Sequence, residues 1–270
     1  MKKILVPTDF TTCAHHATHV ALELARHLGS WVYFLHISPE PAVKSAVHSD
    51  VELELHHQEV STAKSQLDEL VRKGEDMGVT CFPILVFDNG TEKIENYIKP
   101  YAIDLVVMGS HGARGIRKLV IGSNAQRVIR QVDVPVLVVK QIPEKYSIQT
   151  VLFASRFRHD RSSHFSWVAN LVNGLKAKLH LLYLASATKP EPEQSAYSTM
   201  QNLTSGFPGL RYALDYAITN DIEWAIRNVG EKVQADLLCV SGSEHDDGVW
   251  ATHVATKLLD QEQSPVLVIN

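Results

Sequence analysis

The sequence lacks the features that mark several classes of protein. Its three cysteines, Cys13, Cys81 and Cys239, form neither a C-x-x-C pair nor an even disulfide framework. No run approaches the ~18–20 apolar residues of a membrane span, and residues 1–3 lead into a predicted strand rather than a signal region. Charge of one sign is not in large excess, because the formal net charge is −4. We therefore expect a cytoplasmic globular protein with reduced thiols that binds neither a membrane nor nucleic acid.

Short apolar runs alternate with amphipathic segments along the first half of the chain. The alternation favours a parallel, doubly wound α/β sheet, for which 3-2-1-4-5 is a common strand order. In that order strands one and four are neighbours, and a ligand binds beyond their carboxyl ends. The predicted strands span residues 4–7, 31–37, 79–86, 105–108 and 136–140. The predicted helices span residues 14–28, 50–77, 92–101 and 123–130, with Gly29 and Gly78 as helix stops.

The second half of the chain repeats the first after a polar connector at residues 141–147. Residues 151–157 echo residues 4–10, and the closing strands of the two halves are almost identical. Such self-similarity indicates two copies of one domain. We therefore predict two doubly wound, five-stranded parallel sheets in tandem, in domains at 1–142 and 147–270.

A glycine-bearing loop follows the fourth predicted strand. Two residues separate Gly109 from Gly112, nine more precede Gly122 and Ser123, and helical spacing resumes at Ala125. A helix that begins after such a loop presents backbone N–H groups and the positive end of its dipole, which suits an anion. The loop is therefore a candidate phosphate site, with Ser123 as the expected N-terminal cap of the helix. Alternatively, the glycines only make the tight turns that the sheet requires.

This spacing matches neither the Walker pattern nor G-x-G-x-x-G. It is similar to the G-x2-G-x9-G-[S/T] signature of the universal stress protein family. Residues 4–10 and 135–140 also resemble the first and last strands of that family, so the resemblance covers residues 1–140. It implies an adenine nucleotide alpha hydrolase-like fold whose first domain binds ATP or another adenine nucleotide, with or without Mg²⁺. The implied contacts are Pro7, Thr8, Asp9, Ile37, Met108, Gly109, His111, Gly112, Gly122, Ser123 and Asn124.

Several of these residues also have an ordinary structural interpretation. Asp9 matches the acidic residue that contacts ribose and adenine in the family, yet it could be a helix cap. Pro7, Thr8 and Ile37 could be simple strand ends. His111 could donate to a phosphate, but it has no visible partner that would make it a catalytic base. The basic residues of the loop either neutralise phosphate charge or are solvated; they are Arg114, Arg117 and Lys118.

The second domain differs where the nucleotide would bind. Side chains replace the glycines there and block close backbone approach, and acidic residues in its loop, among them Asp246 and Asp247, would repel phosphate. We therefore expect one nucleotide per chain, held by the first domain. The residues at the corresponding positions are Arg156, Ser241, Glu244, Thr252 and His253.

The closing strands and the histidines suggest further contacts. As fifth strands, residues 136–140 and 266–270 would be apolar sheet edges that need covering. The resemblance implies that they pair antiparallel, which gives an intramolecular pseudo-dimer, with a homodimer also possible. On the first predicted helix, His19 is four residues from His15 and three from His16, and either spacing can bring two imidazoles together. Two ligands do not make a zinc site, however. His36 is interpreted as a core histidine.

The function implied by the resemblance is that of an ATP-binding regulatory module in a stress response. A slow ATPase is the first alternative. Efficient phosphoryl transfer needs Mg²⁺ ligands, a positioned nucleophile and cationic stabilisation, and few of these are evident. A scaffold that binds no nucleotide is the second alternative.

Overall fold

The computed structural model describes most of the chain. The described residues are 1–39, 50–88, 91–110, 122–143, 145–157, 162–241, 249–261 and 264–269. Within these ranges every helix is too short or too polar to cross a membrane.

Strands and helices alternate along both halves, as predicted. The first half contains β1 (Lys3–Pro7), α1 (Thr12–Leu28), β2 (Trp31–Pro39), α2 (Asp50–Asp76), β3 (Cys81–Asp88), the 3₁₀ helix η1 (Ile94–Tyr97), α3 (Ile98–Tyr101), β4 (Leu105–Gly109), α4 (Ser123–Gln131) and β5 (Val136–Val139). The second half contains β6 (Thr150–Ser155), α5 (Ser162–Leu175), β7 (Lys178–Ser186), α6 (Glu193–Thr204), β8 (Tyr212–Thr219), α7 (Ile222–Val233), β9 (Leu237–Ser241), α8 (Val249–Gln261) and β10 (Val266–Ile269).

Two elements of the first half differ from the sequence prediction. The single helix expected at 92–101 is instead η1 followed by the short helix α3. Pro100 offers no N–H to extend a helical ladder, and Ala102 ends α3 in the left-handed region at φ 51°. The third strand begins later than predicted, because the N–H of Val79 still closes the end of α2 by donating to the carbonyl of Gly74.

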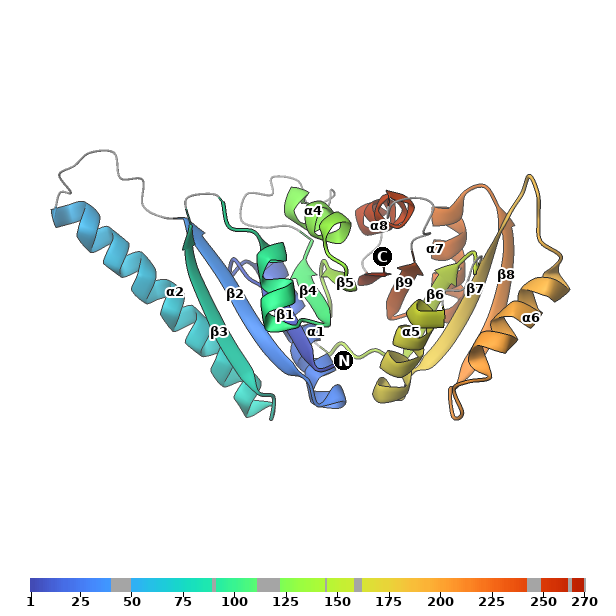
Figure 1. The fold of residues 1–270 in the computed structure, drawn as a ribbon, viewed down its shortest axis with the longest axis horizontal. Helices are drawn as coiled ribbons and strands as arrows, with labels where there is room; N and C mark the ends of the chain where they lie inside the picture. The colour runs from blue at the N-terminus through green and yellow to red at the C-terminus, as the bar shows by residue number, and fades with distance from the viewer. Residues whose placement is uncertain are drawn as a thin grey trace.

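All ten strands form one sheet, in the order β3-β2-β1-β4-β5-β10-β9-β6-β7-β8. Each half has the predicted 3-2-1-4-5 order, so the doubly wound prediction is confirmed. The two sheets expected from the sequence are continuous, because β5 and β10 pair antiparallel at the centre (Figure 1). There Leu137 lies opposite Leu267, its own counterpart in the repeat. The other strand pairs are parallel.

Helices cover both faces of the sheet. Ile4 and Val6 of β1 pack on one side with α1, α2, α5 and α6. Leu5 packs on the other side with α3, α4, α7 and α8. Strands buried on both faces explain the continuous apolar runs in the sequence.

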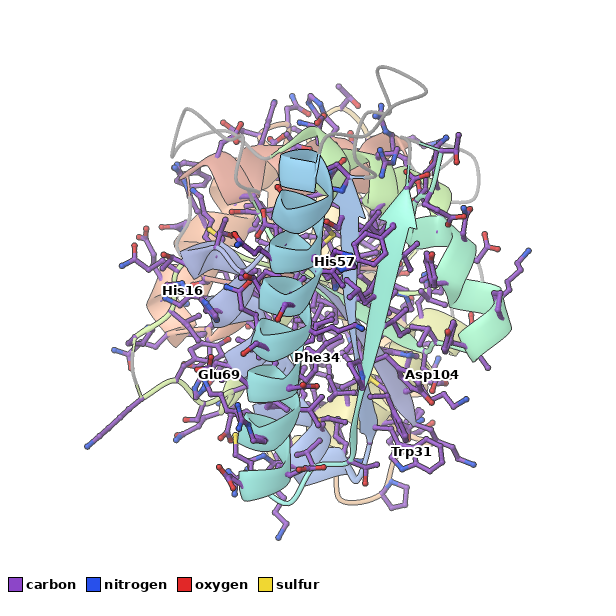
Figure 2. All side chains as sticks on the ribbon, turned by 90° about the vertical axis from the view of Figure 1, so that its left-hand side faces the viewer. His16, Trp31, Phe34, His57, Glu69 and Asp104 are labelled. Atoms are coloured by element: carbon purple, nitrogen blue, oxygen red, sulfur yellow. The ribbon has the colours of Figure 1, made fainter. Side chains whose placement is uncertain are left out.

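The same aspartate contact fixes the start of the first strand in each half. The carboxylate of Asp104, labelled in Figure 2, accepts the backbone N–H groups of Lys2 and Lys3 at 2.7 and 3.0 Å. In the second half, Asp236 accepts those of Gln149 and Thr150 at 2.8 Å. The repeat seen in the sequence is therefore a repeat of contacts as well.

The two halves also meet through helices, α1 against α5 and α4 against α8. A side chain at Gly174 of α5 would overlap Leu28 of α1, so the glycine permits this close approach.

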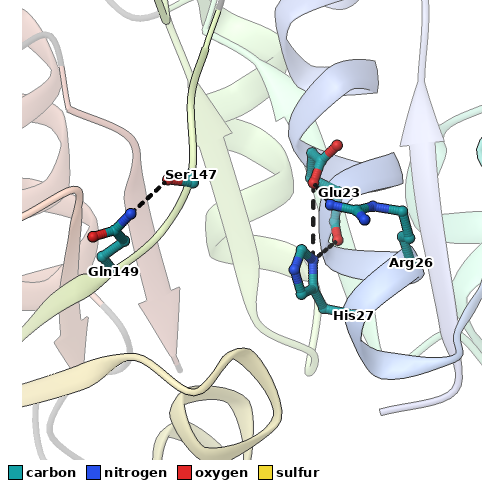
Figure 3. Close-up of polar contacts among 5 residues, drawn as sticks. All are labelled: Glu23, Arg26, His27, Ser147 and Gln149. Atoms are coloured by element: carbon teal, nitrogen blue, oxygen red, sulfur yellow. Dashed lines mark hydrogen bonds and ion pairs between the residues drawn. The ribbon is translucent and has the colours of Figure 1, made fainter.

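The last turn of α1 is braced by Glu23, whose carboxylate lies 2.7 Å from Arg26 and whose carbonyl lies 2.8 Å from Nδ1 of His27 (Figure 3).

Candidate functional site

A tight turn follows β1 at the carboxyl edge of the sheet. The N–H of Thr8 donates to the carbonyl of Leu35 at 2.8 Å, and the Thr8 hydroxyl accepts the N–H of Phe10 at 3.1 Å. Phe10 lies in the left-handed region at φ 60°, where bulky residues are rare. One carboxylate oxygen of Asp9 accepts both the N–H and the hydroxyl of Thr11, at 3.2 and 2.6 Å. Asp9 is thus held at the end of β1 by defined contacts.

The cap of α1 is Thr11 rather than Asp9. The Thr11 side chain accepts the N–H of Ala14 at 3.4 Å, and Asp9 braces the cap residue from outside the helix. The carboxylate therefore lies near the positive end of the α1 dipole, which stabilises its charge. This position is compatible with a second role in binding a ligand.

Gly109, the last residue of β4, lies against the first turn of α1. A Cβ added at this position would lie 3.0 Å from the carbonyl carbon of Cys13 and 3.2 Å from the backbone nitrogen of Ala14. Gly109 therefore has a structural reason to lack a side chain, which its place in the glycine spacing did not reveal.

The two ends of the glycine loop meet at one hydrogen bond. Ser110, which is fully buried, donates its N–H to the carbonyl of Val139 at 2.9 Å. Its own carbonyl accepts the N–H of Gly122 at 2.7 Å. The Gly122 N–H is thus used within the protein, and a phosphate would have to be bound by the donors that follow it.

The N-cap of α4 lies one residue earlier than predicted. Gly122 is the N-cap, with extended angles of φ −65° and ψ 150°, and its carbonyl accepts the N–H of Gln126 at 3.1 Å. Ser123 is the first residue of the helix, so the prediction that it caps α4 is wrong. Ser123 and Asn124 are exposed. Helix geometry leaves the N–H groups of a first turn without an intrahelical acceptor, which suits an anion.

The remaining residues predicted to contact the nucleotide differ in burial, and some lie outside the described residues. Pro7 and Ile37 are half-buried at the carboxyl ends of β1 and β2, which are neighbours in the sheet. The side chain of Met108 is buried in the core cluster that also contains Ala125 and Val128 of α4. His111 and Gly112 lie outside the described residues, as do Arg114, Arg117 and Lys118.

The second half keeps the turn and changes its chemistry. The Ser155 hydroxyl accepts the N–H of Phe157 at 3.1 Å, and Phe157 has φ 46°, as at Thr8 and Phe10. Arg156 occupies the place of Asp9 between them. This replacement agrees with the sequence comparison of the two halves.

The second half also differs at the two ends of the segment that corresponds to the glycine loop. Ser241, at the position of Gly109, has its hydroxyl 2.7 Å from Nδ1 of His164. The helix α8 already begins at Val249, so His253, at the position of Ser123, lies inside it. The N–H of His253 is therefore used within the helix. Glu244, Asp246 and Asp247 lie outside the described residues.

The histidines on α1 were considered as metal ligands in the sequence analysis. Nδ1 of His16 lies 3.1 Å from the carbonyl of Lys140. Burial lowers the pKa of His19 below its usual 6.5, with Lys73 and His16 acting in the same direction and Glu23 opposing them. Among the described residues, His, Cys, Asp and Glu form no group of three or more that could hold a metal ion.

One residue near the turn was not recognised as part of it from the sequence. Nδ1 of His36 lies 2.8 Å from the carbonyl oxygen of Thr8, and its ring centroid lies 4.5 Å from that of Phe10. His36 is half-buried rather than enclosed in the core. Its position on an apolar strand gave no signal of this contact.

The first half is a doubly wound α/β sheet, with a helix N-terminus beyond β4 and a carboxylate beyond the adjacent β1. These two features flank the switch point of the sheet, where proteins of this class bind their ligands. The universal stress protein family model matches residues 1–140, and the chain belongs to that family. The resemblance seen in the motifs is confirmed.

Individual relatives agree with this assignment. Universal stress protein MJ0577 of Methanocaldococcus jannaschii is 29% identical over 154 residues, which are 52% of this chain and 95% of the relative. MJ0531 of the same organism is 31% identical over 147 residues, 53% of this chain and 84% of the relative. A universal stress protein structure from Archaeoglobus fulgidus has a TM-score of 0.72, covering 99% of this chain and 96% of that one. Its sequence identity of 18% means that this last likeness shows the fold alone.

Proposed function

We propose that the first half of the chain binds ATP, and that the protein is a nucleotide-binding regulatory module of a stress response. The observation that carries the proposal is the pairing of two features at adjacent strands. Asp9 is held beyond β1, and the exposed first turn of α4 follows the loop beyond β4. Membership of the universal stress protein family supports the same proposal.

The two features suit different parts of a nucleotide. A carboxylate accepts hydrogen bonds from ribose hydroxyls, and the N–H groups of Ser123 and Asn124 suit phosphate oxygens. Mg²⁺, where present, would be held mainly by the phosphates. Because α1 packs against Gly109, close backbone approach to a phosphate falls to the residues after the loop.

We also propose that the chain consists of domains at 1–142 and 147–270, and that the second acts as a partner domain without a nucleotide. The antiparallel pairing of β5 with β10 would then let one chain take the place of a dimer of single-domain proteins. The three free cysteines suit a reducing compartment such as the cytoplasm.

The test is titration calorimetry with Mg²⁺-ATP on the full chain and on two variants at one position. Gly122→Asp places a negative charge where phosphate is expected, while Gly122→Asn has nearly the same size without the charge. Both residues are favourable N-caps and suit the extended angles of Gly122, so both variants should fold as stably as the wild type. We expect the aspartate variant to bind at least about tenfold more weakly, or about 1.4 kcal/mol, and the asparagine variant to bind within about twofold of wild type.

Equal ATP affinity in the two variants would show that the phosphate does not lie at the start of α4. The same titration should give one site per chain, unchanged by Arg156→Ala. A stoichiometry of two, or loss of binding on altering Arg156 alone, would place the function in the second half.

A further inference from the structure

His36 makes two contacts with the turn that presents Asp9. Nδ1 lies 2.8 Å from the carbonyl oxygen of Thr8, and the imidazole packs at 4.5 Å, between centroids, on the ring of Phe10. A carbonyl oxygen can only accept a hydrogen bond, so Nδ1 carries the proton in this contact. His36 therefore acts on the turn both as a hydrogen-bond donor and as an aromatic surface.

The hydrogen bond fixes the direction in which the chain leaves β1. The carbonyl of Thr8 and the N–H of Asp9 belong to one planar peptide group, so holding the carbonyl also orients Asp9. The Thr8 N–H is fixed as well, since it donates to Leu35 in the neighbouring strand at 2.8 Å. Of these contacts, the one from His36 acts on the peptide that leads into Asp9.

The second half has a tyrosine where the first half has His36. Tyr183 occupies the position of His36, and its ring packs on Phe157 with centroids 5.8 Å apart. The polar atom of a tyrosine lies at the far tip of its ring, so it cannot donate as Nδ1 does. This is also the half in which Arg156 replaces the carboxylate. The first half thus has both the imidazole donor and the aspartate, and the second half has another residue at each of these two positions.

We propose that His36 is a positioning residue of the nucleotide site, whose Nδ1–H orients Asp9 toward the ribose hydroxyls of ATP. This inference rests on the proposed ATP binding. It adds a polar residue that lies outside the loop signature and acts through Thr8 rather than by touching the ligand.

The test separates the two contacts of His36 with two variants. His36→Asn keeps an N–H donor near the place of Nδ1 but loses the ring, and His36→Phe keeps a ring but loses the donor. ATP affinity is measured by calorimetry, and stability by urea unfolding. We expect the phenylalanine variant to bind about fivefold more weakly and the asparagine variant to bind within about twofold of wild type. The asparagine variant should nevertheless be no more stable than the phenylalanine variant, because it loses the packing on Phe10.

The proposal would be overturned if the ATP affinities of the two His36 variants ranked in the same order as their free energies of unfolding. It would also be overturned if the phenylalanine variant bound ATP as tightly as the wild type. Tyr183→Phe serves as the control and should leave ATP affinity unchanged. A wild-type protein that fails to bind ATP would instead refute the proposed function, and this inference with it.

Discussion

Substituting Gly109 by alanine should weaken the packing of α1 on β4. The added Cβ would lie 3.0, 3.1 and 3.2 Å from three atoms of Cys13 and Ala14, two of them backbone atoms. Backbone atoms cannot rotate away as a side chain does, so the first turn of α1 must move by a few tenths of an ångström. Overpacking of this kind costs about 1–3 kcal/mol. The lower entropy of the unfolded alanine chain offsets about 0.4–1 kcal/mol. We therefore expect Gly109→Ala to lower the free energy of unfolding by about 1–2 kcal/mol.

The measurement is urea unfolding followed by circular dichroism, with Gly206→Ala as the matched control. A Cβ added at Gly206 meets nothing within 4 Å, so only the entropic term should remain there, and the control should be no less stable than the wild type. Hydrogen exchange of the α1 amides should rise in Gly109→Ala and stay constant in the control, because the strain acts on the first turn of that helix.

An alanine variant at Gly109 as stable as the wild type would refute the reasoning. It would show that the glycine is not required by the approach of α1. Its function would then have to be sought in the loop alone.

Three further predictions concern stability measured by urea unfolding. Gly174→Leu should cost about 1–3 kcal/mol through its clash with Leu28, and Leu28→Ala in the same chain should restore part of the loss; additive effects would argue against the contact. Tyr146→Phe should cost about 1 kcal/mol, because the phenol donates to the carbonyl of Asp236 at 2.7 Å, and an unchanged midpoint would contradict this. The lowered pKa of His19 means that the unfolded state binds more protons, so stability should fall as the pH drops below about 6.5; His19→Gln should reduce that dependence, and identical pH profiles would count against it.

The fold was predictable because its main determinants are local. Strands buried on both faces read as continuous apolar runs, and Gly29 ends α1 in the left-handed conformation, at φ 64°, that favours glycine. The alternation of elements indicated a doubly wound sheet, and the strand order was taken as the common one for that class. Recognition of the two halves followed from repeated letters. The antiparallel pairing of their closing strands was expected only from the family resemblance, since pairing between distant edges leaves no periodic signal.

The candidate site was predictable in its residues and less so in their roles. The spacing singled out Gly109 and Gly122, and the family resemblance singled out Asp9. The contacts that these residues make depend on α1 and on the loop ends, which are distant in sequence. Ser123 was assigned as a cap because serine favours that position, whereas the backbone makes Gly122 the cap. The contact of His36 with Thr8 crosses between two strands, so neither strand's pattern could indicate it. The ligand assignments themselves stay predictions.

The contact between Leu28 and Gly174 shows what joining two copies in one chain permits. Two identical chains must carry every substitution on both sides of a symmetric contact. Here the repeat position of Gly174 in the first half is His27, whose Nδ1 instead lies 2.8 Å from the carbonyl of Glu23 in the last turn of α1. Glycine was needed on one side only. Because each side is encoded separately, one half can lose residues of the nucleotide motif while its strands still complete the shared sheet.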